Sequence, residues 1–344
     1  MAIFQFKAPD IAVDVGTNNT RVYVKDKGIV VNEPSVVIVR GDSSVNNIIA
    51  AGDSAVELVG RSPGNVRVVH PLRDGVIVDF EMAHTMIQYF ISKAIGSSRV
   101  GNKPRIVVTL PSKISKVERR AMINAVSGQR ARRIYPVEQA FAAALGTGLP
   151  VYEPQGNFIV DIGAGTTEVA IVSMGGIVVS HSMRVAGNKI DEAIAGYLKK
   201  EHAILVTDRV AEQLKLDLAD VRIDEQLEHL AVVRGRDIAT GMPMTVDVNM
   251  AKVSEAISGP IKEILAAIKW VLERIPPEMA ADVLQNGIYL TGGSAALPSL
   301  DAMIATEFGV PVSVARDAGE CTVLGAGYMA DHFDMLGGGQ KNEK

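Results

Sequence analysis

The sequence predicts an α/β fold built from two related domains. The segment DIAVDVGTNNTRVYV at residues 10–24 returns 147 positions later in NFIVDIGAGTTEVAIV at residues 157–172. The motif GIVV then follows in both copies, at residues 28–31 and 176–179. A repeat of this length indicates duplication of a whole domain, and 344 residues leave room for two domains of roughly 150 residues each.

The first half continues after the duplicated hairpin as an alternation of strands and helices. Apolar residues in the stretch 75–95 recur every three or four positions after a short strand, which predicts an amphipathic helix. Ser115 and Glu118 have the spacing of a capping box, which starts another helix. The expected elements are a hairpin at 10–24, a strand at 28–31, a strand and helix within 75–95, a strand at 103–111, and helices at 115–126 and 137–148.

The second half repeats this order, which is typical of α/β proteins. Two stretches fall outside the plan, residues 34–75 and 186–245, and we interpret them as subdomains inserted at equivalent places. The second contains a hairpin pattern, GRDIATGMPMTVDV. The other expected elements are a hairpin at 158–182, a helix at 250–274 that Pro260 should kink, a strand at 287–293, a helix at 297–309 and a strand at 310–315.

Composition argues against several classes of protein. The net charge of −4 gives no general reason to bind nucleic acid, and the single Cys321 excludes an internal disulfide and fits a reducing compartment. The six histidines are scattered, so a transition-metal site is not expected. With no run of about 18 apolar residues and no secretory signal pattern at the N-terminus, we expect a cytoplasmic protein.

One basic concentration stands out against this acidic background. We interpret it as a solvated helix end, because no aromatic residues are interleaved with the arginines. Contact with nucleic acid, an anionic lipid or a partner protein is the alternative. The concentration consists of Arg119, Arg120, Arg130, Arg132 and Arg133.

The turn inside each duplicated hairpin has the composition of a phosphate site. In the second copy, Asp161 is followed by Gly163, Gly165, Thr166 and Thr167, which offer backbone N–H groups and hydroxyl donors within a few residues. We expect the glycines to occupy positions where φ is positive. An ordinary glycine hairpin is the alternative for one such stretch, but the second copy favours a phosphate site.

These motifs resemble the actin, sugar-kinase and heat-shock-chaperone ATPase superfamily, and within it the MreB family of bacterial actins. The resemblance extends from about Asp10 to about Tyr328. The segments that carry it are DVGTNNT, GIVVNEPSVV, HPLRDGVIVDF, VERRAM, VDIGAGTTEVA, AGNKIDEAI, IPPEMAADVLQNGIYLTGG and LGAGYM.

The resemblance implies a duplicated actin-like ATPase fold, with two domains, an inserted subdomain in each, and a nucleotide cleft between the domains. It implies a division into an N-terminal membrane-contact segment (1–8), subdomain IA (9–33, 76–147 and 318–334), IB (34–75), IIA (148–185 and 246–317), IIB (186–245) and a flexible tail (335–344).

By the same resemblance, the two turns clamp ATP phosphates and three further segments contact the nucleoside or the second turn. Asp14 and Asp161 would hold a hydrated Mg²⁺. Ser294 stands where relatives usually have a third glycine, and Glu212 and Lys215 lie one helical turn apart, although an exposed helix pair is the alternative for these two. The expected nucleotide-binding residues are Asp14, Gly16, Thr17, Asn18, Asn19, Gly163, Ala164, Gly165, Thr166, Gly187 (with Asn188 beside it), Glu212, Lys215, Gly292, Gly293 and Ser294.

The expected catalytic residues are Glu138, Gln139, Asp161 and Thr167. Relatives commonly have Glu-Glu-Pro where this chain has Glu138, Gln139 and Ala140. A glutamine can orient a water but is no practical general base, so catalysis would depend on positioning and on neutralising phosphate charge. Polar helix surface is the alternative for Gln139. A Walker loop is absent, and GAGYMA at 325–330 is better explained by close helix packing than by a Rossmann fingerprint.

The resemblance implies an ATP-hydrolysing filament protein at the inner face of the cell membrane that organises wall synthesis and rod shape. Its partners would be other copies of itself, the membrane surface and membrane proteins of the elongation machinery. The expected nucleotide is ATP before GTP, although the sequence alone leaves both open. A soluble small-molecule kinase of the same fold is the alternative, but no kinase sugar-site motif is found, and only a short tail follows the last helix where a chaperone would have a substrate domain.

The expected membrane contacts are Ile3, Phe4 and Phe6. The loop GSSRVGNK at 96–103, where relatives often have an apolar membrane contact, offers only Val100. We therefore expect monomers to bind membranes weakly and filaments to bind by avidity. An edge strand or a disordered end is the alternative for the N-terminal segment.

Overall fold

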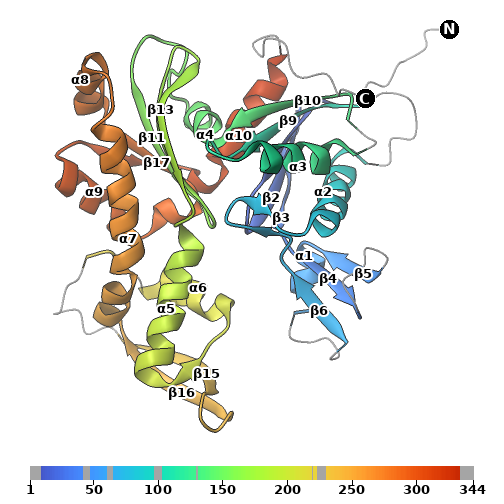
Figure 1. The fold of residues 1–344 in the computed structure, drawn as a ribbon, viewed down its shortest axis with the longest axis vertical. Helices are drawn as coiled ribbons and strands as arrows, with labels where there is room; N and C mark the ends of the chain where they lie inside the picture. The colour runs from blue at the N-terminus through green and yellow to red at the C-terminus, as the bar shows by residue number, and fades with distance from the viewer. Residues whose placement is uncertain are drawn as a thin grey trace. The chain divides into compact units, whose positions relative to one another are not determined.

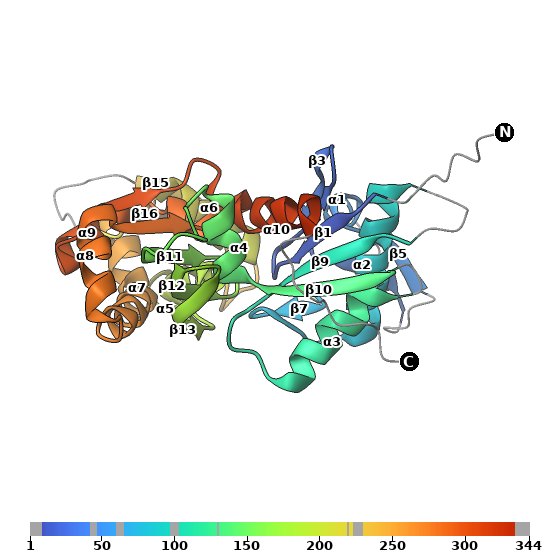
Figure 2. The same ribbon diagram turned by 90° about the horizontal axis from the view of Figure 1, so that it is seen from above.

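The computed structural model describes residues 9–41, 47–59, 65–96, 103–128, 131–218, 220–222 and 230–333. The chain divides into two units, Met1–Val151 with Glu320–Lys344, and Tyr152–Gly319. Each unit has its own five-stranded sheet, as Figures 1 and 2 show. Each also has its own apolar core. The predicted α/β fold of two related domains is confirmed, while the finer division into four subdomains stays a prediction.

The sheet of the first unit has the strand order β10-β9-β1-β2-β3. Strands β1, β2 and β3 form an antiparallel meander, and β9 and β10 run parallel to β1. All five residues of β1 are buried, as expected of a central strand that is covered on both faces. The strands are β1 Ile11–Val15, β2 Asn19–Val24, β3 Gly28–Pro34, β9 Arg105–Leu110 and β10 Arg133–Glu138.

The sheet of the second unit repeats this arrangement, with the order β13-β12-β11-β17-β18. Three antiparallel strands again precede two parallel ones. The strands are β11 Asn157–Ile162, β12 Thr167–Ser173, β13 Gly176–Met183, β17 Ile288–Thr291 and β18 Val312–Val314. The duplication that the sequence predicts therefore covers the whole sheet.

The repeated GIVV motif marks a shared irregularity in the third strand of each sheet. Val31 and Ile29 pair with consecutive residues of β2, which leaves Val30 as an extra residue, and Val178 is the extra residue opposite β12. A β-bulge of this kind bends a strand and increases its twist. The third residue of GIVV occupies the bulge in both copies.

Helix α4 lies against helix α10 in the first unit, and glycines make this contact close (Figure 2). A Cβ on Gly325 would overlap the carbonyl oxygen of Ala142, and one on Gly146 would overlap the carbonyl oxygen of Cys321. The interpretation of the GAGYMA glycines as helix-packing residues is thus confirmed for Gly325, whereas a Cβ on Gly327 would meet the ring of Tyr23 on β2. The helices of this sheet are α2 Phe80–Ile95, α3 Lys116–Ser127, α4 Gln139–Gly146 and α10 Cys321–Asp331.

The starts of these helices follow local sequence signals. Both hydrogen bonds of the predicted capping box are present, since Glu118 N donates to Ser115 Oγ and Ser115 N donates to the Glu118 carboxylate. Helix α4 begins two residues later than predicted, because Val137 and Glu138 complete the ladder of β10 with β9.

The first insertion is a small three-stranded sheet with the order β5-β4-β6 and a short helix. Its own core consists of Val36, Ile38 and Ala55. Its elements are β4 Val37–Arg40, β5 Ile48–Ala51, α1 Asp53–Val56 and β6 Val66–Val69, followed by the two-stranded β7 Leu72–Arg73 and β8 Val76–Ile77.

The second insertion combines two helices with a sheet of order β14-β15-β16. The predicted hairpin in this stretch is confirmed as β15 and β16. The elements are α5 Gly187–His202, β14 Ile204–Leu205, α6 Asp208–Leu218, β15 Leu230–Asp237 and β16 Pro243–Asn249.

The remaining helices of the second unit are α7 Met250–Leu272, α8 Pro277–Asn286 and α9 Leu300–Phe308, with short 3₁₀ turns at Gly293–Ala296 and Ala318–Glu320. Helix α7 is assigned continuously through Pro260, so the predicted long helix is present, and the kink stays a prediction. Within the described part of the chain, no helix combines the length and apolar character needed to cross a bilayer.

Candidate functional site

The first predicted phosphate turn joins β1 to β2. Gly16 N donates to Asn19 O at 3.1 Å, which closes the turn. A Cβ on Gly16 would lie only 2.6 Å from Asn19 O. Glycine is therefore required here by the close approach of backbone to backbone.

The second turn, between β11 and β12, is closed by the equivalent hydrogen bond. Gly163 N donates to Thr166 O at 2.9 Å, and a Cβ on Gly163 would lie 3.2 Å from that oxygen. None of the turn glycines, Gly16, Gly163 and Gly165, has a positive φ. The expectation of left-handed glycines in these turns is therefore wrong. Turn closure, not left-handed backbone, explains Gly16 and Gly163.

The two turns are expected to differ in their tolerance of a methyl group. Gly16→Ala should weaken nucleotide binding at least tenfold, because the Cβ displaces Asn19 O and reshapes the turn. The matched Gly163→Ala should cost threefold or less, because its neighbour needs to move by only a few tenths of an ångström. Equilibrium titration with a fluorescent ATP analogue measures both, and equal losses would contradict this account of the turns.

Each turn is preceded by an aspartate that a threonine of the neighbouring parallel strand holds. Thr109 Oγ1 donates to Asp14 Oδ1 at 2.6 Å, and Thr291 Oγ1 donates to Asp161 Oδ1 at 3.1 Å. Sequence analysis gave neither threonine a role beside an aspartate, although each lies near the end of an apolar strand. Burial raises the pKa of Asp14, while the charge of Arg21 and the Thr109 hydrogen bond act in the opposite direction.

The first turn is also bonded to both segments that connect the first insertion to the sheet. Ser35, just after β3, donates through Oγ to Gly16 O at 2.8 Å and through its backbone N to Asn18 O at 2.7 Å. Gly75, between β7 and β8, donates from its backbone N to Thr17 Oγ1 at 2.9 Å. The shape of this turn and the position of the inserted sheet are therefore coupled.

Three segments that are far apart in sequence meet at the second turn. Gly187 N donates to Gly163 O at 3.1 Å, and Asn188 N donates to Ala164 O at 2.8 Å. Ser294 Oγ donates to Gly163 O at 2.9 Å. The serine that replaces the usual third glycine thus ties the 291–294 segment to the turn.

Lys215 joins the same group from helix α6. Its Nζ lies 3.0 Å from the carboxylate oxygens of Asp191 and 3.5 Å from Gly187 O, and both charged side chains are mostly buried. Burial raises the pKa of Asp191 to about 6, while the charge of Lys215 acts in the opposite direction. Glu212, one turn earlier on α6, is exposed. The predicted residues 163–164, 187, 215 and 294 are therefore neighbours in the structure.

The predicted catalytic residues of the first unit lie where β10 passes into α4. Gln139 is the first residue of α4 and is 8% exposed, and Glu138 is the last residue of β10. Because β1, β9 and β10 are parallel, their carboxyl ends lie at one edge of the sheet, which places Gln139 at the same edge as Asp14. Burial raises the pKa of Glu138, and the charge of Arg119 acts in the opposite direction.

Thr167 is fully buried at the start of β12, and its hydroxyl donates to Val185 O at 2.7 Å. That hydrogen bond fixes the chain between the second turn and α5. Contact of Thr167 with a catalytic water stays a prediction. Ile3, Phe4, Phe6, Val100 and Arg130, named above as membrane or basic residues, lie outside the described residues.

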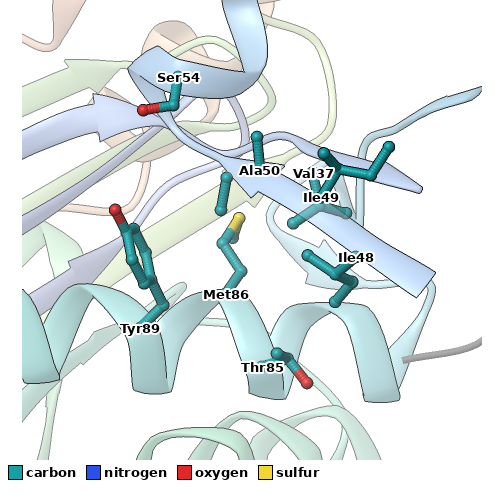
Figure 3. A pocket seen from close by; sticks show the side chains of 9 residues that line it. Val37, Ile48, Ile49, Ala50, Ser54, Thr85, Met86 and Tyr89 are labelled. Carbon is teal, nitrogen blue, oxygen red and sulfur yellow. The ribbon is translucent and has the colours of Figure 1, made fainter. Parts of the chain in front are cut away.

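A separate apolar pocket lies between helix α2 and the small inserted sheet, with a volume of about 240 Å³ (Figure 3). Among the described residues that line it, none is charged and none is a predicted site residue. Its lining consists of Val37, Ile48, Ile49, Ala50, Ala51, Ser54, Thr85, Met86 and Tyr89.

Three comparisons with known proteins identify the family to which this sequence and fold are similar. The family model described as MreB/Mbl protein matches residues 8–338. The cell shape-determining protein Mbl of Bacillus subtilis (strain 168) is 42% identical over 329 residues, covering 96% of this chain and 98% of that protein. The cell shape-determining protein MreB of Escherichia coli (strain K12) is 40% identical over 331 residues, covering 96% and 95%. The crystal structure of MreB 5 of Spiroplasma citri bound to AMPPNP has a TM-score of 0.87 and 32% identity, covering 96% of this chain and 98% of that one.

Proposed function

The chain belongs to the MreB/Mbl family, and from that premise we propose that it is an actin-like cytoskeletal ATPase. It binds and hydrolyses ATP, polymerises into filaments that associate with the inner face of the cell membrane, and organises cell-wall synthesis and rod shape. Its relatives in Bacillus and Escherichia are named cell shape-determining proteins, and its structural neighbour from Spiroplasma binds AMPPNP.

The duplicated aspartate and turn carry this proposal. Each unit offers a tight turn closed by the same hydrogen bond, preceded by an aspartate that a threonine orients. Backbone N–H groups and hydroxyls gathered in such turns suit phosphate oxygens. We assign phosphate contacts to residues 16–19 and 163–166 and nucleoside contacts to Glu212, Lys215 and the segment 292–294, with Gly187 at the second turn.

We assign the binding of a hydrated Mg²⁺ to Asp14 and Asp161. Magnesium usually keeps several waters and is bound through one or two carboxylates together with substrate phosphates. Asp14 and Asp161 supply one carboxylate at each turn, each fixed in orientation by its threonine. When bound, the ion neutralises phosphate charge. We assign the orientation of the attacking water to Gln139, and we assign Glu138 and Thr167 as further catalytic groups.

A soluble kinase of the same fold is the competing function, and one pair of measurements separates the two. Light scattering should rise when Mg-ATP is added to the purified protein, and ATP consumption should be unaffected by glucose-type acceptors. Acceptor phosphorylation without a rise in scattering would favour the kinase. Running the same assay with Mg-GTP settles the nucleotide preference.

Membrane attachment is assigned to Ile3, Phe4 and Phe6. Burying three such side chains at roughly 1.5–3 kcal/mol each gives only marginal, reversible binding to a monomer. A filament presents many such segments to the membrane at once, so its overall membrane affinity rises by avidity. Membrane proteins of the elongation machinery would then meet the filament at this surface.

Deletion of residues 2–7 is therefore expected to abolish filament pelleting with anionic vesicles while polymerisation in ATP continues. Co-sedimentation with and without vesicles measures both properties. The matched control is replacement of Ile3, Phe4 and Phe6 by serine, which keeps the length and should have the same effect. Pelleting of the truncated filaments at the full-length level would rule out this anchor.

A further inference from the structure

Arg21 on β2 faces Asp14 directly across the first hairpin. The two residues are register partners, so their side chains lie on the same face of the strands. Arg21 Nη1 lies 3.7 Å from Asp14 Oδ2, which is too long for a hydrogen bond, and the arginine side chain is only 19% exposed. Its Nε is buried and has no hydrogen-bond partner within the part of the chain that the structure describes.

The buried Nε of a mostly buried arginine side chain needs a hydrogen-bond acceptor. Buried polar groups are almost always hydrogen-bonded. Asp14 satisfies little of this need, because its Oδ1 already accepts from Thr109 and its Oδ2 stays beyond hydrogen-bond distance of Arg21. Arginine presents its donors in a planar fork that matches phosphate oxygens.

The second hairpin shows that the duplicated fold does not itself require an arginine here. The equivalent residue is Glu168, the register partner of Asp161. It is fully buried, and its carboxylate accepts from Ser182 Oγ at 2.5 Å. The repeat thus keeps the aspartate and the turn but reverses the charge of the residue opposite, so the cation is particular to the first turn.

We propose that Arg21 is a phosphate ligand of the first turn, and that its guanidinium donates to phosphate oxygens of the bound nucleotide. This deepens the proposed function and rests on it. Arg21 adds a fixed positive charge beside Asp14, so the first unit contributes a protein cation to phosphate binding as well as the carboxylate for Mg²⁺. The loss of Arg21 should then weaken the binding of ligands that carry phosphates, such as ATP, and not the binding of adenosine.

Titration of the full chain with ATP and with adenosine tests this role. Arg21→Leu should weaken ATP binding at least tenfold and leave adenosine binding unchanged, and Arg21→Lys, which keeps the charge but not the fork, should be intermediate. The melting temperature without nucleotide shows whether each variant still folds, because the substitution also removes the positive charge beside the buried Asp14. Should Arg21→Leu fail to fold, Arg21→Gln carries the same expectation.

Arg133→Leu is the matched control. It removes the same charge from the same sheet, but Arg133 begins β10 at the edge opposite the turn, so ATP affinity should not change. Unchanged ATP affinity in the Arg21 variants, or an equal loss for adenosine, would overturn the inference while leaving the proposed function intact. A wild-type chain that binds no ATP would overturn the proposed function itself.

Discussion

Replacing Gln139 with alanine is expected to lower ATP turnover at least tenfold while nucleotide binding is retained. A tenfold loss corresponds to about 1.4 kcal/mol of transition-state stabilisation. The expectation follows from the position of Gln139, which is nearly buried at the sheet edge that also carries Asp14. An amide there can orient a water toward a phosphate without taking its proton. Phosphate release in single-turnover and steady-state experiments measures the effect.

Gln155→Ala provides the matched control for this substitution. Gln155 lies in the loop before β11, and its carbonyl oxygen accepts a hydrogen bond from Asn157, which is not part of either turn. Turnover should therefore not change. If Gln139→Ala releases phosphate at the wild-type rate, Gln139 is polar helix surface and another group orients the water. If it also loses nucleotide affinity, its role is in binding.

Replacing Gly325 with alanine is expected to destabilise the first unit by about 3 kcal/mol or more. The added Cβ would overlap the carbonyl oxygen of Ala142 on α4. Because the obstacle is backbone, no change of rotamer relieves it, and α10 has to separate from α4. Urea unfolding followed by circular dichroism should show a lower midpoint for this variant.

A second helix glycine gives the opposite expectation. Gly196 in α5 is exposed, and a Cβ there meets no atom within 4 Å among the described residues. Gly196→Ala should therefore stabilise the protein by roughly 0.5–1 kcal/mol, the difference in helix propensity. If both variants shift the midpoint in the same direction, close packing of α4 and α10 is not what requires Gly325.

Local signals made much of the fold predictable. The repeated strands, the GIVV motif and the Ser115 capping box each encode structure through near neighbours, and each is confirmed. The small sheet β5-β4-β6 was not resolved into elements, because short strands with a core of only three residues leave little periodicity in the sequence. The start of α4 was misplaced because Val137 and Glu138 pair with β9 as the last residues of β10, and this long-range pairing is not visible in the sequence.

The site was predictable as a set of motifs but not as a set of contacts. Thr109 and Thr291 matter only because parallel pairing brings them beside Asp14 and Asp161, and neither pairing is visible in a single sequence. The turn glycines illustrate the same limit. Their residue type was correctly linked to tight turns, but the reason is a carbonyl oxygen across the turn and not the sign of φ.

Sedimentation of the purified chain over a concentration series, with Mg-ATP, with ATP and chelator, and without nucleotide, tests nucleotide-driven assembly most directly. Head-to-tail contacts that do not close into a ring generate open filaments. With Mg-ATP, we expect protein above a threshold concentration to pellet, and negative-stain electron microscopy of that pellet to show filaments. Protein that binds ATP yet stays in the supernatant at every concentration, or that pellets equally without nucleotide, would contradict the assignment.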